Sequence, residues 1–188
     1  MMRTLSRFSL IVLATFASSG AGAAVADGGS YRIAPTSSIG FHVGQVGGGG
    51  IDGTIKEVSG QFRLDPSDPA RASVSIDLKA ASVATGQPRI DAFLQSEAVF
   101  DADAHPDITF RSTRVVQTGA RTARIEGTLT AHGVSRPETF QAELTNQEKG
   151  RFVFHVVGDI YRTPYGMGVG TPIYSNVVNF DMRLEGQR

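Results

Sequence analysis

The feature that most constrains the fold of this chain is a two-residue alternation of apolar and polar side chains. In residues 73–79 (SVSIDLK) every second position is apolar, and the same pattern recurs in residues 124–131, 140–145, 152–157 and 178–184. Successive side chains of a β-strand point to opposite faces, so this period gives one face to a core and the other to water. The alternation therefore predicts half-buried β-strands along most of the chain.

Turn-forming residues separate the predicted strands. They occur at residues 65–69, 118–119, 135–137 and 149–150, where Gly, Pro, Asp and Ser gather. They divide the chain into about eight strands, many of them near twelve residues long. Short connections favour an up-and-down antiparallel meander, and closing it into a barrel removes exposed strand edges. We therefore expect an all-β fold, an extended eight-stranded antiparallel barrel.

Two segments interrupt the alternation. Residues 88–96 (PRIDAFLQS) predict a short helix, because Pro88 suits a first helical position and the apolar residues that follow share one face. Residues 44–50 (GQVGGGG) resemble a phosphate-binding loop only in glycine content, because a strand-like segment rather than a helix follows. We interpret this glycine-rich segment as a β-hairpin turn.

The first 26 residues have the layout of a secretory signal peptide. Two arginines precede an apolar stretch at residues 8–18, and small residues then offer cleavage sites after Ala23 or Ala26. The stretch is short for a membrane span. We therefore expect an exported protein, periplasmic or secreted, whose single domain occupies residues 27–188.

The composition excludes several classes of protein. The chain has no cysteine, which rules out disulfides, thiolate metal sites and cysteine nucleophiles. Its 18 Lys and Arg residues balance 18 Asp and Glu residues, whereas nucleic-acid binding normally requires a basic excess. No long apolar run follows the N-terminal segment, so we expect no stable membrane insertion.

The apolar face of the predicted barrel is rich in phenylalanine. The side chains that the alternation turns inward, and that we take as candidates for binding a hydrocarbon chain, are Phe41, Phe62, Ile76, Phe110, Leu129, Phe140, Phe152, Phe154 and Phe180. The same face carries small residues such as Gly60, Gly127 and Gly158, which could leave space between the rings. A barrel of eight strands either fills with side chains or holds one small ligand. The pattern therefore leaves both a packed core and a ligand cavity open.

Arg162 is a charged residue in phase with the apolar face. It continues the inward parity of Phe154 and Ile160, so it should lie at a strand end near one mouth of the barrel. Two roles fit this position. The guanidinium could contact an anionic head group, or it could form an ion pair at the rim with Asp91 or Glu97 of the predicted helix.

The sequence offers no constellation for catalysis or metal binding. The alternation turns His42, His132 and His155 outward, and His105 precedes a proline in a loop. No histidine pair has the spacing of metal ligands, and no nucleophile motif is present. We therefore expect no catalytic residue, no metal and no cofactor.

Five segments, in order along the chain, resemble the YceI-like family of polyisoprenoid-binding proteins. The resemblance begins with residues 31–41 (YRIAPTSSIGF) and continues through residues 58–62 (VSGQF). The most specific block is residues 99–113 (VFDADAHPDITFRST), followed by residues 125–137 (IEGTLTAHGVSRP) and 162–168 (RTPYGMG). The resemblance implies a lipocalin-like eight-stranded barrel whose apolar tunnel binds an isoprenoid or similar amphiphile.

Together these observations predict a non-enzymatic periplasmic carrier for an isoprenoid, a quinone or another long-chain lipid. Two alternatives stay open, namely an enzyme acting on a lipid in the same tunnel, and a stress-response or protein-interaction module with a packed barrel. A homodimer is also compatible with the sequence, because the strand at residues 151–161 keeps Val153, Val157 and Tyr161 on its outer face.

Overall fold

A computed structural model describes residues 28–65 and 68–188 of the chain. The predicted signal peptide, residues 1–26, lies outside the described residues. Within them the chain is mostly β-structure with one short α-helix, as the alternation predicted. No helix among the described residues is long and apolar enough to cross a membrane.

The elements follow the predicted order closely. The strands are β1 (Gly29–Ile33), β2 (Ser38–Gly44), β3 (Gly50–Ile55), β4 (Val58–Leu64), β5 (Ser73–Lys79), β6 (Val83–Ala84), β7 (Asp107–Gln117), β8 (Thr122–Ala131), β9 (Val134–Glu148), β10 (Arg151–Tyr161) and β11 (Val177–Gln187). The helix is α1 (Pro88–Gln95), and single 3-10 turns occur at η1 (Pro69–Arg71), η2 (Ala80–Ser82) and η3 (Thr163–Tyr165).

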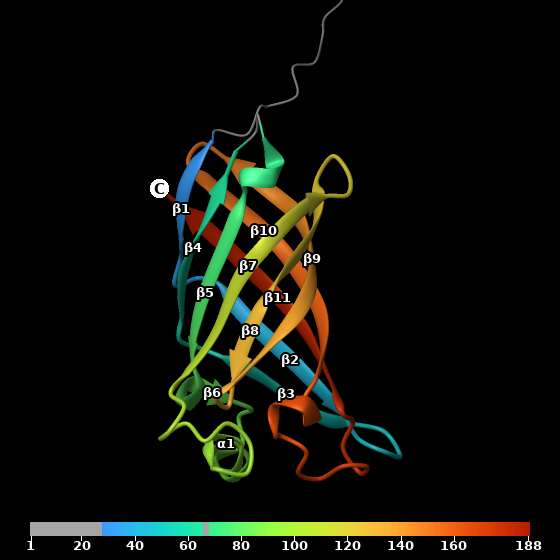
Figure 1. Ribbon diagram of the computed structural model, residues 1–188. Helices are drawn as coiled ribbons and strands as arrows, with labels where there is room; N and C mark the ends of the chain where they lie inside the picture. The colour runs from blue at the N-terminus through green and yellow to red at the C-terminus, as the bar shows by residue number, and fades with distance from the viewer. Residues whose placement is uncertain (1–27, 66–67) are drawn as a thin grey trace, which may run out of the picture.

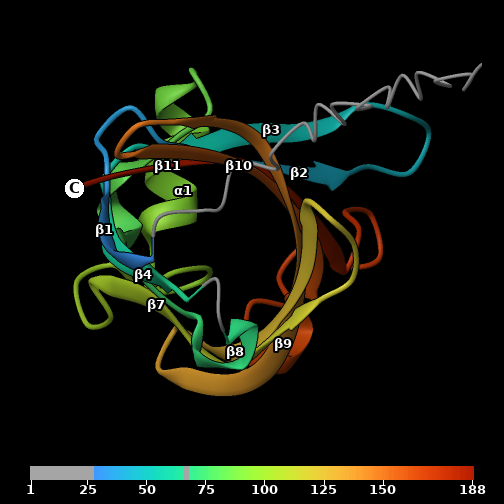
Figure 2. The same cartoon turned by 90° about the horizontal axis from the view of Figure 1, so that it is seen from above.

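The strands close into an antiparallel barrel (Figures 1 and 2). The order around the barrel is β1, β4, β5, β7, β8, β9, β10 and β11, and the closing pair joins Arg32 and Ile33 of β1 to Gln187 and Gly186 of β11. This is the eight-stranded antiparallel barrel that the sequence predicted, with its short helix. Closure leaves this ring of strands with no free edge.

Two of the eight barrel strands are interrupted, which accounts for the larger number of named strands. β1 and β2 both pair with β11 and are separated by residues 34–37. In the same way β4 pairs with β1 and β5, while β3 pairs with β2 and, at its far end, with β6. The break lets β2 and β3 diverge from β5 at one end of the barrel, and β6 and α1 fill the space that opens.

The two ends of the barrel differ in what covers them (Figure 1). The lower end carries α1, β6, the β2–β3 hairpin and residues 163–176, whereas the upper end carries η1, short turns and the C-terminus. At α1, Pro88 occupies the first turn, and the Asp91 carboxylate accepts hydrogen bonds from the backbone N–H and hydroxyl of Thr85 at 2.7 and 2.6 Å. The Thr85 hydrogen bonds also lower the pKa of Asp91.

Three local predictions had different outcomes. The turn predicted at residues 135–137 is wrong, because these residues belong to β9 and pair with residues 128–130 of β8. The glycine-rich segment is the predicted hairpin turn, because β2 ends at Gly44 and β3 begins at Gly50. His132 was wrongly expected to face outward from a strand. It lies with Gly133 in the turn between β8 and β9, and both residues have positive φ, 49° and 70°. A two-residue hairpin turn of this type ends the alternation, so parity no longer applies.

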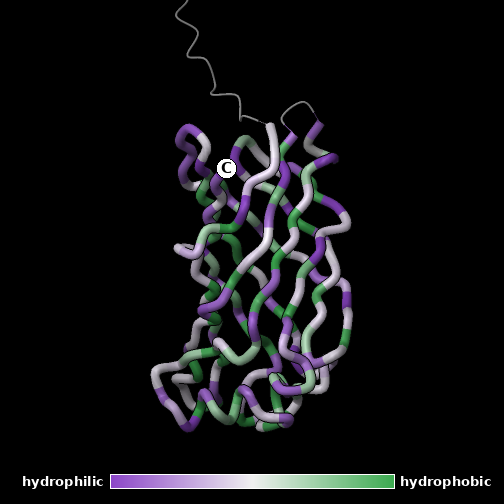
Figure 3. Tube along the Cα trace, turned by 90° about the vertical axis from the view of Figure 1, so that its left-hand side faces the viewer, coloured by the Kyte–Doolittle hydropathy of each residue, from purple (hydrophilic) through white to green (hydrophobic). Residues whose placement is uncertain are grey.

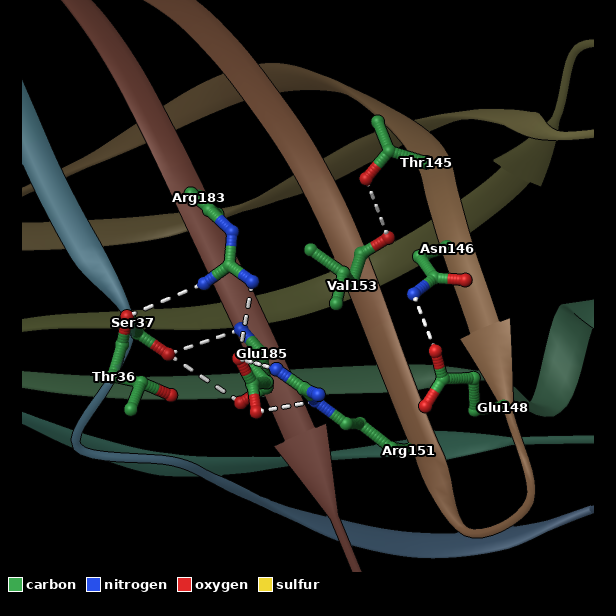
Figure 4. A network of polar contacts seen from close by, with 9 residues as sticks. All are labelled: Thr36, Ser37, Thr145, Asn146, Glu148, Arg151, Val153, Arg183 and Glu185. Carbon is green, nitrogen blue, oxygen red and sulfur yellow. Dashed lines mark hydrogen bonds and ion pairs between the residues drawn. The ribbon is translucent and has the colours of Figure 1, made fainter.

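A polar network secures the interrupted strand to β11 on the outside of the barrel (Figure 4). The Glu185 side chain, on a residue that is 4% exposed, accepts two hydrogen bonds from Arg151 at 2.6 and 2.8 Å and one from Arg183 at 3.2 Å. The Ser37 hydroxyl accepts a hydrogen bond from the Glu185 backbone N–H at 3.0 Å. The Arg151 hydrogen bonds, above all, lower the pKa of Glu185 to about 2.

Hydrophilic and hydrophobic residues alternate along the strands (Figure 3). The predicted outer apolar patch on β10 is smaller than expected. Val153 is buried, and only Val157 and Tyr161 are exposed. Burial on both faces of β10 at this point follows from the packed network around Glu185 and Arg151.

Candidate binding site

The barrel encloses an apolar cavity of about 250 Å³, lined from the lower end up to Val74 and Leu184. Its walls come from all of the long strands, from α1 and from residues 163–176. Seven of the ten predicted contact residues line it, namely Phe41, Ile76, Phe110, Leu129, Phe140, Arg162 and Phe180. The lining also includes side chains that strand parity did not point to, among them Phe93 and Leu94 of α1 and Met167.

Several of the Phe rings lie directly against glycines of neighbouring strands. A Cβ added at Gly53 would clash with the Phe41 ring, and a Cβ at Gly127 would clash with the Phe110 ring. Gly158 is covered by the ring of Phe140 in the same way. The sequence suggested that small inward residues leave gaps between the rings. At Gly127 and Gly158 the rings instead occupy that space, and a Cβ at Gly60 would meet the backbone of β5.

The other three predicted contacts lie outside the cavity lining. Phe62, Phe152 and Phe154 pack with Tyr31 at the upper end, in a cluster that we call the aromatic plug. The Tyr31 ring stacks on Phe62 with centroids 5.3 Å apart and meets the edge of Phe152 at 4.7 Å. Phe154 meets Phe62 edge to face at 5.4 Å. These three rings therefore pack in the aromatic plug and do not line the cavity.

The cavity opens at the lower end, between α1 and residues 163–176, a gap that we call the mouth. Phe93 of α1 and Val169 line the cavity and are also 46% and 42% exposed. Two further exposed apolar residues, Val46 and Ile173, lie at this end, where the Val46 N–H donates to the Ile173 carbonyl at 2.9 Å. The rim of the mouth is therefore apolar, like the interior behind it.

Arg162 lies at the mouth, but its donors are directed at the backbone. Nε donates to the Ser175 carbonyl at 2.8 Å, Nη1 donates to the carbonyls of Met167 and Val169, and Nη2 donates to the Tyr174 carbonyl at 3.3 Å. The side chain is 7% exposed, and burial lowers its pKa. The loop of residues 163–176 therefore surrounds the guanidinium, which holds it through hydrogen bonds to four backbone carbonyls.

The predicted ion pair of Arg162 with the helix does not form. Asp91 is engaged by Thr85, and the acceptors of Arg162 are backbone carbonyl oxygens rather than the carboxylates of Asp91 or Glu97. Parity correctly placed Arg162 inward, but the folding of the following loop over it depends on contacts that no local pattern encodes. Its role toward a head group stays a prediction.

A second polar group beside the cavity was missed by the sequence reasoning. Tyr165, fully buried and part of the lining, donates its hydroxyl hydrogen bond to Glu138 at 2.8 Å. Glu138 is two residues from Phe140 on β9 and so shares its inward parity, which was the available signal. Burial, with the hydrogen bond to Glu138, raises the pKa of Tyr165. His132 Nδ1 lies 2.9 Å from the Tyr165 carbonyl oxygen.

The remaining histidines contribute nothing to the cavity. His42 and His155 lie on the exterior, where they contact Asp52 at 2.7 Å and Asp181 at 3.1 Å. His105 packs its ring against that of His132 with centroids 5.6 Å apart. Within residues 28–65 and 68–188, no three His, Asp or Glu side chains gather as a metal site.

Comparison with known proteins places this barrel in a family. Residues 31–186 match the family described as YceI-like domain. A UPF0312 protein of Pseudomonas putida strain F1 is 31% identical over 153 residues, which cover 79% of each chain. A UPF0312 protein of Pseudomonas fluorescens strain SBW25 is likewise 31% identical over 153 residues, again 79% of each chain.

Solved structures share the fold. BcnA of Burkholderia cenocepacia superimposes with a TM-score of 0.76 at 23% identity, over 81% of this chain and 98% of BcnA. The YCEI protein of Campylobacter jejuni gives 0.69 at 26% identity, over 74% and 86% of the two chains. A polyisoprenoid binding domain from Saccharophagus degradans gives 0.68 at 15% identity, over 84% and 97%. With a match spanning nearly all of the described residues and a barrel of the same architecture, the chain belongs to the YceI-like family.

Proposed function

We propose that this protein binds a long-chain lipid, an isoprenoid, a quinone or a fatty chain, with its hydrocarbon tail in the barrel cavity. The observation that carries the proposal is an apolar cavity that opens at one end of a closed barrel. The polyisoprenoid binding domain of Saccharophagus degradans, a fold relative, supports the ligand class by its description. The cavity also weighs against the alternative of a barrel packed solid throughout.

The apolar lining supplies the binding energy that this function needs. Burying one methylene stabilises a complex by about 0.8 kcal/mol. A dozen buried carbons contribute roughly 10 kcal/mol before the cost of association is subtracted. The remainder suffices for useful affinity without any polar contact, so the tail can dominate recognition.

We propose a carrier or sequestering role rather than catalysis. The described lining contains no carboxylate and no histidine, and its titratable side chains are Arg162, Tyr165 and Tyr174. Arg162 is engaged by backbone carbonyls, and the Tyr165 hydroxyl is engaged by Glu138. The lining that the structure describes therefore offers no pair of free titratable side chains arranged as the acid and base of a reaction.

We further propose that the protein acts outside the cytoplasmic membrane, in the periplasm or after secretion. The support is the N-terminal layout of two arginines, an apolar stretch and small residues. N-terminal sequencing of protein purified from its native host tests this. A mature terminus near Ala24 or Asp27 is expected, and a chain that begins at Met1 would contradict it.

Mass spectrometry of organic extracts tests the binding function directly. Protein purified from its native host without detergent should release a prenyl or fatty-chain lipid in near-stoichiometric amount. The matched control is the variant Leu129→Asp, which places a charge on the cavity wall and should purify without lipid. An extract free of lipid, together with no gain in thermal stability when prenols are added, would refute the proposal.

A further inference from the structure

The cavity is blind, because the aromatic plug closes it above. Two residues of the lining, Val74 and Leu184, are the direct strand partners of plug residues, Val74 of Phe62 and Leu184 of Phe154. The wall of the cavity therefore runs directly into the plug. A chain that enters through the mouth meets aromatic rings at the far end.

The plug is built to resist displacement. Its rings come from three strands, β1, β4 and β10, and Phe62 contacts each of the other three, with centroid distances of 5.3 Å to Tyr31, 6.4 Å to Phe152 and 5.4 Å to Phe154. A Cβ at Gly186 would clash with the Phe62 ring, so this ring is also pressed against the wall. Tyr31 and Phe152 are almost fully buried behind it. Close-packed interiors of this kind yield only at the cost of repacking several side chains.

The register of β11 gives the depth of the cavity. Its lining extends from Val178, near the mouth, to Leu184, beside the plug. At about 3.3 Å per residue this path is roughly 20 Å long, and a barrel tilt of about 40° reduces it to roughly 15 Å along the axis. An extended hydrocarbon advances roughly 1.3 Å per bond, given a C–C length of about 1.5 Å. The depth thus matches about 12 backbone carbons.

We propose that the aromatic plug is a stop that sets the length of the hydrocarbon chain that this barrel can bury. Chains of up to about 12 backbone carbons gain affinity with each added carbon, whereas longer chains project from the mouth and gain little more. The ligand class is therefore an amphiphile with a farnesyl-length or dodecyl-length buried segment. This inference rests on the proposed lipid-binding function, and Phe154 and Phe62 become residues that determine specificity.

A homologous series of n-alkanols, from octanol to octadecanol, measures the chain length at which the plug ends the gain in affinity. Each alkanol displaces an environment-sensitive fluorescent probe from the full-length mature protein, and the affinity is plotted against chain length. The affinity should rise by about fourfold per methylene and then level off near dodecanol.

Two variants should move the plateau in opposite directions. Phe154→Ala removes the ring beside Leu184 and should shift the plateau to longer alkanols by at least one even-numbered member of the series. Leu184→Phe adds a ring at the same level and should shift it to shorter ones. Phe180→Ala, the matched control, widens the cavity below the plug. It should change the affinity for every alkanol and leave the plateau where it is.

The outcomes separate the stop from the binding function. No displacement by any alkanol would refute the lipid-binding proposal itself. Displacement whose affinity rises without a plateau through octadecanol would overturn the stop. A plateau that neither Phe154→Ala nor Leu184→Phe moves would also overturn it, and Leu184→Phe keeps the test decisive if Phe154→Ala does not fold.

Discussion

The upper and lower ends of this barrel use the same residue types for opposite purposes. At the upper end Phe62, Phe152 and Phe154 meet one another and Tyr31, so the interior is solid. At the lower end Phe110 meets Phe140 at 5.1 Å and Phe140 meets Phe180 at 6.5 Å, and the centre stays open. Rings lie against glycines at both ends, so neither aromatic content nor a glycine opposite a ring determines whether a barrel is hollow. The ends differ in how many rings converge, because Phe62 meets three other rings, whereas no ring of the described lower end meets more than two.

The two ends also differ in how they are tied together. Upper strands are joined on the outside by the carboxylate of Glu185, whereas the lower loop is held from within by the guanidinium of Arg162. The carboxylate of Glu185 accepts hydrogen bonds from two arginines, Arg151 and Arg183, and so holds neighbouring strands together. A guanidinium among carbonyls holds a loop that borders the mouth, and backbone hydrogen bonds of a loop open more readily than a packed strand pair.

The largest expected contrast is in the cost of removing a ring. Phe152→Ala in the plug should lower the free energy of unfolding by about 3–5 kcal/mol, because a buried ring surrounded by others leaves a cavity. Phe180→Ala should cost only about 1–2 kcal/mol, because one side of that ring already faces empty space and has few contacts to lose. Urea unfolding of both variants makes the comparison. Equal losses would show that the two ends are packed alike.

The next effect concerns the loop at the mouth. Arg162→Leu leaves four carbonyls of residues 167–175 without their donor and should lower the free energy of unfolding by about 2–4 kcal/mol. Hydrogen–deuterium exchange should accelerate in residues 163–176 and stay unchanged in β1 and β4. The control Arg162→Lys retains the charge but not the fork of donors, and it should show intermediate exchange. Unchanged protection of this loop in Arg162→Leu would contradict the role assigned to the guanidinium.

A smaller effect, specific to the upper end, depends on pH. The pKa of Glu185 lies at about 2 in the folded protein, below its ordinary value of 4.5. A lowered pKa means that the unfolded chain binds the proton more readily, so stability is complete above about pH 4.5 and decreases as the pH falls toward 2. Glu185→Gln should lower the melting temperature by roughly 3–8 °C at pH 7.

Thermal unfolding between pH 7 and pH 2 checks this prediction. The melting temperature of the wild type should fall more steeply below pH 4.5 than that of Glu185→Gln, so that the two curves converge in acid. Asp52→Asn, on the exposed exterior, is the control and should leave the acid-induced decrease unchanged. Parallel curves for the wild type and Glu185→Gln would mean that the Glu185 carboxylate does not contribute to the loss of stability in acid.

The smallest effect is expected at Tyr165. Tyr165→Phe removes one hydrogen bond to Glu138 and should cost about 1 kcal/mol in unfolding free energy. Lipid binding should change little, because the aromatic ring stays in the cavity wall. Isothermal titration with farnesol measures the binding affinity of the variant and of the wild type. A loss of affinity greater than about tenfold would assign the hydroxyl a direct role in binding the head group.

Most of the fold could be predicted from the sequence because its signals are local. The alternation in β5, β8 and β11 identified the strands, and Pro88 marked the start of the helix. The break between β3 and β4 could not be read from periodicity, because it arises where the strand exchanges β5 for β6 as its partner. The break at residues 34–37 could not be read either, because the chain pairs with β11 on both sides of it. Closure through Ile33 and Gly186 joins opposite ends of the chain, and no local pattern reports such a pairing.

The candidate site was predicted less completely, for a related reason. Parity establishes that Phe62 and Phe110 both point inward. Only the register shows that Phe110 lies against Gly127 and meets one other ring, whereas Phe62 meets three other rings. Arg162 was correctly placed at the lower end, yet its carbonyl acceptors belong to a loop whose path no periodicity defines. The inward parity of Glu138 was present in the sequence, but its partner Tyr165 lies in the loop after β10, where periodicity does not report which side chains meet.

A crystal structure with a bound n-alkanol tests the central contrast most directly. Co-crystallisation with dodecanol should show a chain that enters beside Phe93 and Val169, follows the wall from Val178 to Leu184 and ends below the Phe154 ring, with the plug unchanged. A cavity filled by its own side chains, or a chain that threads between Phe62 and Phe154, would contradict the division into a hollow end and a filled end.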